Sequence, residues 1–149
     1  MNLQKYTQKS IEAIQNMQTV AAEYQNPQIE QQHLAYTLLT QEEGLIPELL
    51  IQMGVNINGI VKKVEQEIEK LPHVSGSREA GRVYIAADMD KIFTKAEKLA
   101  DSMKDEYVSV EHIFLSLVTS PNAAMKKIFE EYGIDKNHFT KALVKVRGN

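Results

Sequence analysis

The segment that most resembles a catalytic motif is residues 76–83, whose glycines have the spacing of a phosphate-binding loop. That motif needs a lysine that reaches the phosphates and a serine or threonine that holds Mg²⁺. Arg82 and Val83 occupy these two positions, and no apolar strand precedes the segment. The sequence therefore argues against nucleotide binding here, and we expect no cofactor in this chain.

The chain contains four histidines and no cysteine, so thiolate metal sites, thiol nucleophiles and disulfides are excluded. No two histidines have the spacing of a helical zinc motif. His33 and His112 could pair into a two-histidine site, but no third ligand is evident. We therefore expect no metal, and we expect each ring to hydrogen-bond the backbone or a neighbouring carboxylate near a helix start.

Neighbouring acidic residues offer no better case for catalysis. The side chains of Glu42-Glu43 and Glu130-Glu131 would point about 100° apart on a helix, so neither pair shares a face. Serine, histidine and aspartate are present, but no serine lies in a nucleophile elbow. The sequence therefore predicts that this chain is not an enzyme and has no catalytic residues.

Composition narrows the classes of protein to which this chain could belong. The chain has 149 residues, is 43% hydrophobic and 25% charged, and has a formal net charge of −3, so it has the composition of one globular domain without a basic stripe for nucleic acid. No apolar run is long enough for a signal peptide core or a membrane span. We expect a soluble, cytoplasmic domain that binds neither nucleic acid nor membrane.

The chain consists of two similar halves, because a shift of 79 residues places residues 29–67 on residues 108–146 without a gap. The aligned pairs include six identities, among them His33 with His112 and Gly54 with Gly133. The apolar positions keep their class along the register with the periodicity of a helix. We interpret this pattern as an internal duplication.

Each half is predicted to contain four helices with matched ends. Thr7 is an expected N-cap, Asn56 and Asp135 are expected to cap the fourth helix of each half, and Gly54 and Gly133 to end the third in the left-handed conformation. The expected helices span residues 7–24, 31–40, 45–53, 57–70, 88–104 and 110–119, a seventh that starts at Ser120 and Pro121, and 136–147.

Residues 71–87 between the halves contain prolines and glycines, which predict a flexible loop. A half of about 65 residues would bury only a small core alone. We therefore expect one domain over residues 1–149, with repeats at about 1–70 and 88–147 packed about a pseudo-twofold axis. The expected fold class is all-α, with eight helices.

Five strings mark the two halves and their ends. They are residues 3–10 around Thr7, Ile29-x-x-x-His33-Leu34, Val108-Ser109-Val110-Glu111-His112-Ile113, Leu71-Pro72-x-Val74-Ser75-Gly76 and Val144-x-Val146-Arg147-Gly148-Asn149. Together they resemble the Clp N-terminal domain, the duplicated eight-helix module of Clp/Hsp100 ATPases, and the last two are similar to the ClpB branch. The first copy departs from the family's Glu-His form, because Gln32 precedes His33.

The resemblance implies the substrate-binding N-terminal domain of an ATP-dependent chaperone. The full protein would be a hexameric disaggregase that captures unfolded or aggregated polypeptides and works with an Hsp70 partner. ATP and Mg²⁺ would belong to ATPase domains outside this chain, and the fragment alone would be a monomer. The alternative is an adaptor-docking N-domain of a ClpC- or ClpA-type unfoldase. The missing Thr-Glu-His string in the first copy favours ClpB.

The resemblance also implies a client-binding groove, which we place between the first helix and the fifth and sixth helices. The candidate site residues, three polar and three apolar, are Thr7, Asp105, Glu111, Ile11, Phe93 and Phe114. The polar residues match family positions implicated in substrate handling, and the apolar ones are candidate walls. Each also has a structural interpretation, as a helix cap, a partner of the helix dipole or a core residue.

The two halves differ at two positions near the expected groove. Asn26 in the first half corresponds to Asp105 in the second, and Gln32 corresponds to Glu111. If function is asymmetric, we expect it where the second half carries these carboxylates and the first does not.

Overall fold

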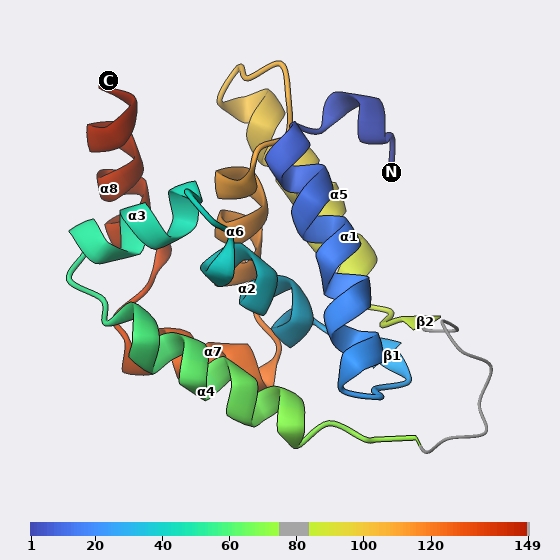
Figure 1. Cartoon of the computed structure of the whole chain (residues 1–149). Helices are drawn as coiled ribbons and strands as arrows, with labels where there is room; N and C mark the ends of the chain where they lie inside the picture. The colour runs from blue at the N-terminus through green and yellow to red at the C-terminus, as the bar shows by residue number, and fades with distance from the viewer. Residues whose placement is uncertain (75–83, 149) are drawn as a thin grey trace.

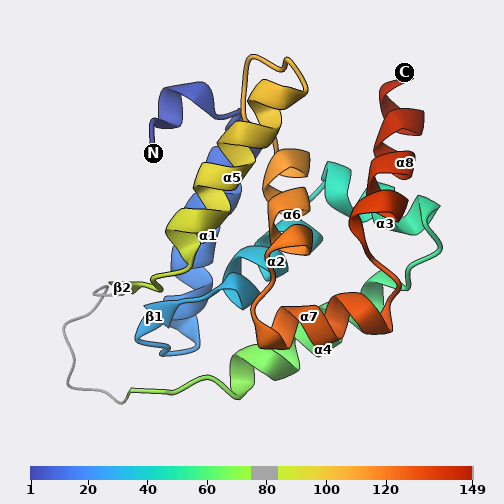
Figure 2. The same cartoon turned by 180° about the vertical axis from the view of Figure 1, so that it is seen from behind.

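The computed structural model describes residues 1–74 and 84–148, and these residues form eight α-helices with one short 3-10 helix and two short strands (Figures 1 and 2). The predicted all-α fold class is confirmed. The elements are η1 (Leu3–Lys5), α1 (Gln8–Glu23), β1 (Gln28–Ile29), α2 (Gln31–Thr40), α3 (Leu45–Gln52), α4 (Ile57–Glu69), β2 (Tyr84–Ile85), α5 (Met89–Ser102), α6 (Val110–Thr119), α7 (Ala123–Glu131) and α8 (Lys136–Arg147).

The fourth helix of each half begins at the predicted cap. Asn56 Oδ1 accepts a hydrogen bond from the Gly59 N–H at 3.0 Å, and Asp135 Oδ1 accepts one from the His138 N–H at 2.8 Å. Each cap satisfies an N–H that has no partner within its helix. Gly54 and Gly133 follow α3 and α7 with φ of +83° and +66°. Both left-handed stops are therefore confirmed.

The predicted start of the seventh helix is wrong. Ser120 instead ends α6, and its N–H donates to the Ser116 carbonyl. Asn122 caps α7, because its Oδ1 accepts from the Met125 N–H at 2.9 Å and leaves Pro121 outside the helix. The backbone N–H of Asn122 also donates to Gln31 Oε1 at 2.8 Å. A contact with the other half of the chain thus fixes this cap, and local spacing does not reveal it.

Short strand pairings join each half to the other. Ile29 in β1 lies opposite Ile85 in β2, in a parallel pair that ends the segment predicted to be an irregular loop. The same 79-residue shift relates this pair to a second parallel bridge, between Tyr6 and Val108. In both cases a residue in the segment before the first helix of one half pairs with a residue in the segment before the second helix of the other. Backbone pairing therefore joins the two halves at two places.

The core lies around α2 and α6, which are buried along most of their lengths. Helix α1 packs on α2, and α5 packs on α6. The outer helices pair across the halves, α3 with α8 and α4 with α7, and Figure 1 shows these two pairs away from the α1 and α5 end. The pairing of Tyr6 with Val108 places the N-terminal residues beside the connection between α5 and α6.

Candidate functional site

Thr7 lies at the junction of η1, α1 and the α5–α6 connection. Its Oγ1 accepts from the Ser10 N–H at 3.2 Å, so Thr7 is the N-cap of α1, as predicted. Its backbone N–H donates to the Val108 carbonyl at 3.0 Å, and Ser10 Oγ donates to the same oxygen at 3.0 Å. Thr7 thus fixes the start of α1 against the segment that precedes α6.

Asp105 and Glu111 belong to a charged cluster with Arg147 at the end of α8. Arg147 Nη2 lies 2.6 Å from Glu111 Oε2 and 2.9 Å from Asp105 Oδ2. The Ser109 N–H donates to His112 Nδ1 at 2.9 Å, so the ring proton lies on Nε2, which donates to Asp105 Oδ2 at 2.8 Å. One guanidinium therefore ties the loop after α5, the first turn of α6 and the last turn of α8 together.

Hydrogen bonding in this cluster controls its titration. Partial burial alone would raise the pKa of Asp105, but hydrogen bonds from Arg147 and His112 outweigh it and lower the pKa below its usual value. The hydrogen bond to Glu111 likewise raises the pKa of Arg147, although desolvation opposes it. Asp105 and Arg147 therefore both stay charged at neutral pH.

The equivalent cluster in the first half is uncharged. The Glu30 N–H donates to His33 Nδ1 at 2.8 Å, and His33 Nε2 lies 2.8 Å from Asn26 Oδ1. Burial lowers the pKa of His33 to about 4, which keeps its ring neutral. Ile68 is fully buried at the position of Arg147. Each histidine therefore bonds the backbone at a helix start, as predicted, and only the second half builds an ionic cluster.

The three apolar candidates lie at different depths. Phe114 is fully buried, and its ring packs against those of Phe129 and Phe139 with centroids 5.7 and 5.3 Å away. Phe93 is also buried, whereas Ile11 is partly buried against the same core. In this conformation the two phenylalanines support the surface from beneath.

A cavity of about 260 Å³ opens beside Asp105, between η1, α5 and the α5–α6 connection. Four carboxylates line it, and Lys5 is the single lysine among the described lining residues. The carboxylates belong to Glu97, Asp101, Asp105 and Glu106. Two apolar side chains, Leu3 and Tyr107, belong to the segments that border this cavity and are 41% and 48% exposed. This end of the molecule is therefore acidic with exposed apolar side chains, and we call it the acidic face.

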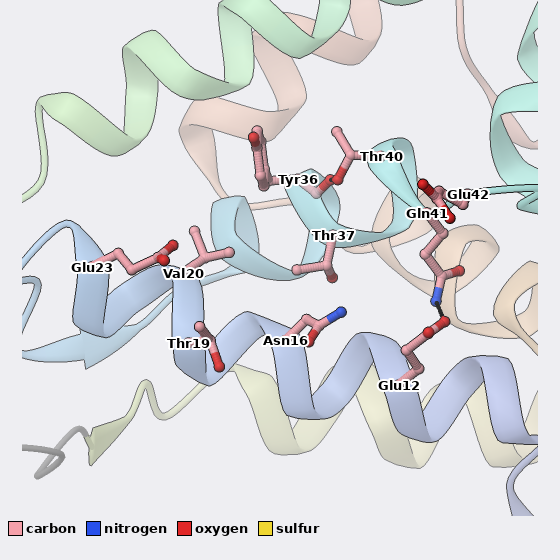
Figure 3. A pocket seen from close by; sticks show the side chains of 10 residues that line it. All are labelled: Glu12, Asn16, Thr19, Val20, Glu23, Tyr36, Thr37, Thr40, Gln41 and Glu42. Atoms are coloured by element: carbon pink, nitrogen blue, oxygen red, sulfur yellow. Dashed lines mark hydrogen bonds between the residues drawn. The ribbon is translucent and has the colours of Figure 1, made fainter.

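A second cavity, of about 410 Å³, lies between α1 and α2 and is shown in Figure 3. Most of its lining side chains are polar, and Gln41 Nε2 donates across it to Glu12 Oε2 at 3.1 Å. Glu12, Glu23 and Glu42 come from separate turns and connections, so they bring no nucleophile and base together. This cavity provides a polar cleft without a catalytic arrangement.

The structure also bears on the nucleotide, metal and membrane sites considered from the sequence. The loop predicted not to bind nucleotide, residues 76–83, lies outside the described residues. Within residues 1–74 and 84–148, no group of three or more His, Cys, Asp or Glu side chains is placed to hold a metal ion. None of the described helices is long and apolar enough to span a bilayer.

Comparison with known proteins decides the family. The pattern of the Clp repeat N-terminal domain matches residues 5–132, most of the chain. The chain belongs to this family. The ClpB chaperone of Clostridium tetani is 38% identical over 151 aligned residues, which cover 100% of this chain and 17% of that protein. The chain therefore corresponds to a Clp N-terminal domain and spans about a sixth of the length of such relatives.

Solved Clp N-terminal domains share the fold. The Hsp104 N-terminal domain from Candida albicans superposes with a TM-score of 0.80 at 21% identity, covering 97% of this chain and 92% of that one. The N-domain of ClpV in complex with a VipB peptide superposes with a TM-score of 0.73 at 18% identity, covering 95% and 86%. Both likenesses support the eight-helix architecture.

Within this Clp N-terminal domain, the sequence singled out Asp105 and Glu111 as candidates but did not reveal Arg147, which pairs with both. The internal duplication contained a sign that Arg147 takes part in this cluster. A shift of 79 residues places Arg147 on Ile68, and a buried apolar position that becomes arginine needs partners for its charge. The two carboxylates that distinguish the second half are those partners.

Proposed function

We propose that this chain is the client-binding N-terminal domain of a ClpB-type ATP-dependent chaperone, which captures exposed apolar segments of unfolded proteins. The relation to ClpB over the whole chain carries the proposal. The peptide bound to the ClpV N-domain supports it, because a domain of similar fold binds a peptide there. The absence of a catalytic arrangement among the described residues fits a module that binds.

The binding surface we propose is the acidic face, with Thr7, Ile11, Asp105 and Glu111 as its frame. Exposed Leu3 and Tyr107 would contact apolar client side chains, since burying such surface is favourable with little sequence preference. The surrounding carboxylates would favour client segments that carry lysine or arginine. Phe93 and Phe114 would act from beneath, by holding α5 and α6 in place.

The charged cluster gives this surface its shape. Arg147 neutralises part of the charge of Asp105 and Glu111, so these carboxylates hold the α5–α6 connection rather than repel one another. Thr7 fixes the same connection through Val108. The proposed role of these polar residues is therefore to position the surface on which Tyr107 lies.

The whole protein would supply the remaining functions. We propose an AAA+ ATPase that uses ATP and Mg²⁺ in domains outside this chain, assembles as a homohexamer and cooperates with Hsp70 to disaggregate and refold stress-denatured proteins in the cytoplasm. The length of the ClpB relatives supports this assignment, because this chain covers only 17% of the C. tetani protein. The isolated chain is proposed to be a monomer.

A pair of exposed tyrosines provides a matched test. Tyr107 is 48% exposed on the acidic face, and Tyr84 is 55% exposed on β2. Binding of fluorescently labelled α-casein, an unfolded client, is measured by anisotropy for the wild type, Tyr107→Ser and Tyr84→Ser. We expect Tyr107→Ser to weaken binding about tenfold, equivalent to ~1.4 kcal/mol, and Tyr84→Ser to leave it unchanged.

Two results would contradict the proposal. Equal affinities for the two variants would remove the acidic face from client binding. Failure of the wild type to bind casein, together with binding of a folded adaptor protein, would instead favour adaptor docking of the ClpC type.

A further inference from the structure

An apolar cavity of about 810 Å³ lies between α3 and α8, on elements that do not form the acidic face. Its described lining residues include Met53, Ala142 and Val144 together with three lysines, and none is a carboxylate. The lysines are Lys136, Lys141 and Lys145. Val144 is 45% exposed, although it is aliphatic. The volume is within the range of ligand sites, about 300–1,000 Å³.

The internal duplication provides a comparison for this cavity, because α4 and α7 form the equivalent outer pair. There Tyr132 replaces Met53, and Gly59 replaces His138. The Tyr132 hydroxyl would lie only 2.9 Å from a Cβ added at Gly59, so the aromatic side chain reaches across to α4. The same architecture therefore accommodates an aromatic side chain between its outer helices.

The solvent-facing residues also differ between the two outer pairs. Glu65-Gln66 on α4 corresponds to Val144-Lys145 on α8. The fold thus tolerates a carboxylate and an amide at these exposed positions, and it does not require an exposed valine there. Together with the cavity beside it, the exposed valine next to a lysine forms a surface that is both apolar and basic.

A buried hydroxyl beside the cavity also distinguishes α8 from α4. Thr140 Oγ1 is buried and has no hydrogen-bond partner among the described residues, and Thr140 lines this cavity. The equivalent residue on α4 is Val61, which packs against the core without a polar group.

We propose that the cavity between α3 and α8 docks an acidic amphipathic peptide segment that inserts an aromatic side chain. The aromatic side chain would occupy the position that Tyr132 fills in the equivalent pair, and aspartates or glutamates beside it would contact the three lysines. Helices with apolar side chains on one face dock in such grooves. The site is separate from client binding on the acidic face and has the opposite charge preference.

The test uses a fluorescein-labelled synthetic helical peptide with phenylalanine and leucine on one face and glutamates elsewhere. The control peptide carries lysine in place of each glutamate. Anisotropy is measured for the wild type and for Val144→Glu/Lys145→Gln, which installs the pair that α4 already carries. We expect the wild type to bind the glutamate peptide and not the lysine peptide, and the double variant to bind at least about tenfold more weakly.

A matched control changes the same charges elsewhere. Thr94→Glu/Lys98→Gln alters two exposed residues of α5 and lowers the net charge by the same amount. This variant should retain full peptide affinity, which separates docking from a general effect of net charge. A thermal melt of each variant checks folding, and Lys136→Gln/Lys141→Gln serves as a second cavity variant if the first is unstable.

Three outcomes overturn the proposal. They are equal binding of the glutamate and lysine peptides, unchanged affinity in the folded cavity variants, and equal weakening by the α5 control. Concentration-dependent dimerisation that the cavity variants abolish would assign the surface to a second copy of this chain instead. Unlabelled α-casein should not displace the peptide, so failure of this proposal and failure of client binding are distinguishable.

Discussion

Replacing Arg147 with isoleucine, the residue at the equivalent position 68, should lower the free energy of unfolding by about 2–3 kcal/mol. The substitution leaves Asp105 and Glu111 without the guanidinium that contacts both, at 2.9 and 2.6 Å. An unpaired carboxylate in a poorly hydrated position must be protonated, rehydrated or exposed by local rearrangement. All three responses destabilise the native state.

The magnitude follows from burial. Removing one partner of a fully buried ion pair costs about 3–5 kcal/mol. The Glu111 side chain is only 8% exposed, but those of Asp105 and Arg147 are 27% and 29% exposed, so water partly screens the cluster. We therefore reduce the cost to about 2–3 kcal/mol, which lowers the melting temperature by roughly 4–12 °C for a domain of this size.

The assay is chemical denaturation at neutral pH, followed by circular dichroism. The decisive comparison is the triple variant Asp105→Asn/Glu111→Gln/Arg147→Ile, which converts the cluster to the uncharged set of the first half. Because replacing a complete buried ion cluster is often neutral, we expect the triple variant to regain most of the lost stability.

The pH dependence provides a second check on the same cluster. The lowered pKa of Asp105 means that its contribution to stability is present above the ordinary carboxyl pKa and is lost as pH falls through the native value. The difference between wild type and Arg147→Ile should therefore shrink in acid. A single variant as stable as wild type, or a triple variant less stable than the single, would refute this account of the cluster.

Three further perturbations test other parts of the fold. Because burial lowers the native pKa of His33 to about 4, its neutral ring contributes fully to stability above pH 6.5. That contribution, up to about 3 kcal/mol, is lost as pH falls toward 4. NMR titration of the ring should give that low pKa, and a midpoint near 6.5 would contradict it. Gly133→Ala should cost about 1–2 kcal/mol in a thermal melt, because φ is +66°, and an unchanged melt would show that the turn relaxes. The pKa of His73 is raised because the backbone carbonyls of Glu69 and Tyr24 accept hydrogen bonds from its ring. Both hydrogen bonds are present at low pH, and they are lost as pH rises through the native pKa of the ring. The NMR titration midpoint of His73 should therefore exceed that of an unfolded peptide.

Sequence reasoning predicted features that depend on local chemistry. The caps at Asn56 and Asp135 and the stops at Gly54 and Gly133 follow from side-chain reach and backbone conformation within a few residues. The duplication extended these predictions across the chain, because a feature found in one half could be checked at the equivalent position of the other. All eight helices were therefore anticipated within a few residues at most ends.

The errors involve contacts between the halves. The N-cap at Asn122 depends on Gln31, which is 91 residues away in the chain, and Ser120 with Pro121 offered a plausible local alternative. The pairing of Ile29 with Ile85 also joins residues far apart in the chain, and two-residue strands have no periodicity to detect. The candidate walls Phe93 and Phe114 could not be assigned to surface or core, because helical spacing alone does not say which apolar face is covered.

The most direct test of the proposed function is an NMR titration of the isotopically labelled chain with α-casein. We predict that chemical-shift changes gather on the acidic face, at η1, the end of α5 and the α5–α6 connection that carries Asp105 and Tyr107. Resonances of α3, β2 and the first turns of α8 should stay in place. Shifts scattered over the whole surface, or no shifts at millimolar casein, would contradict client capture at this face.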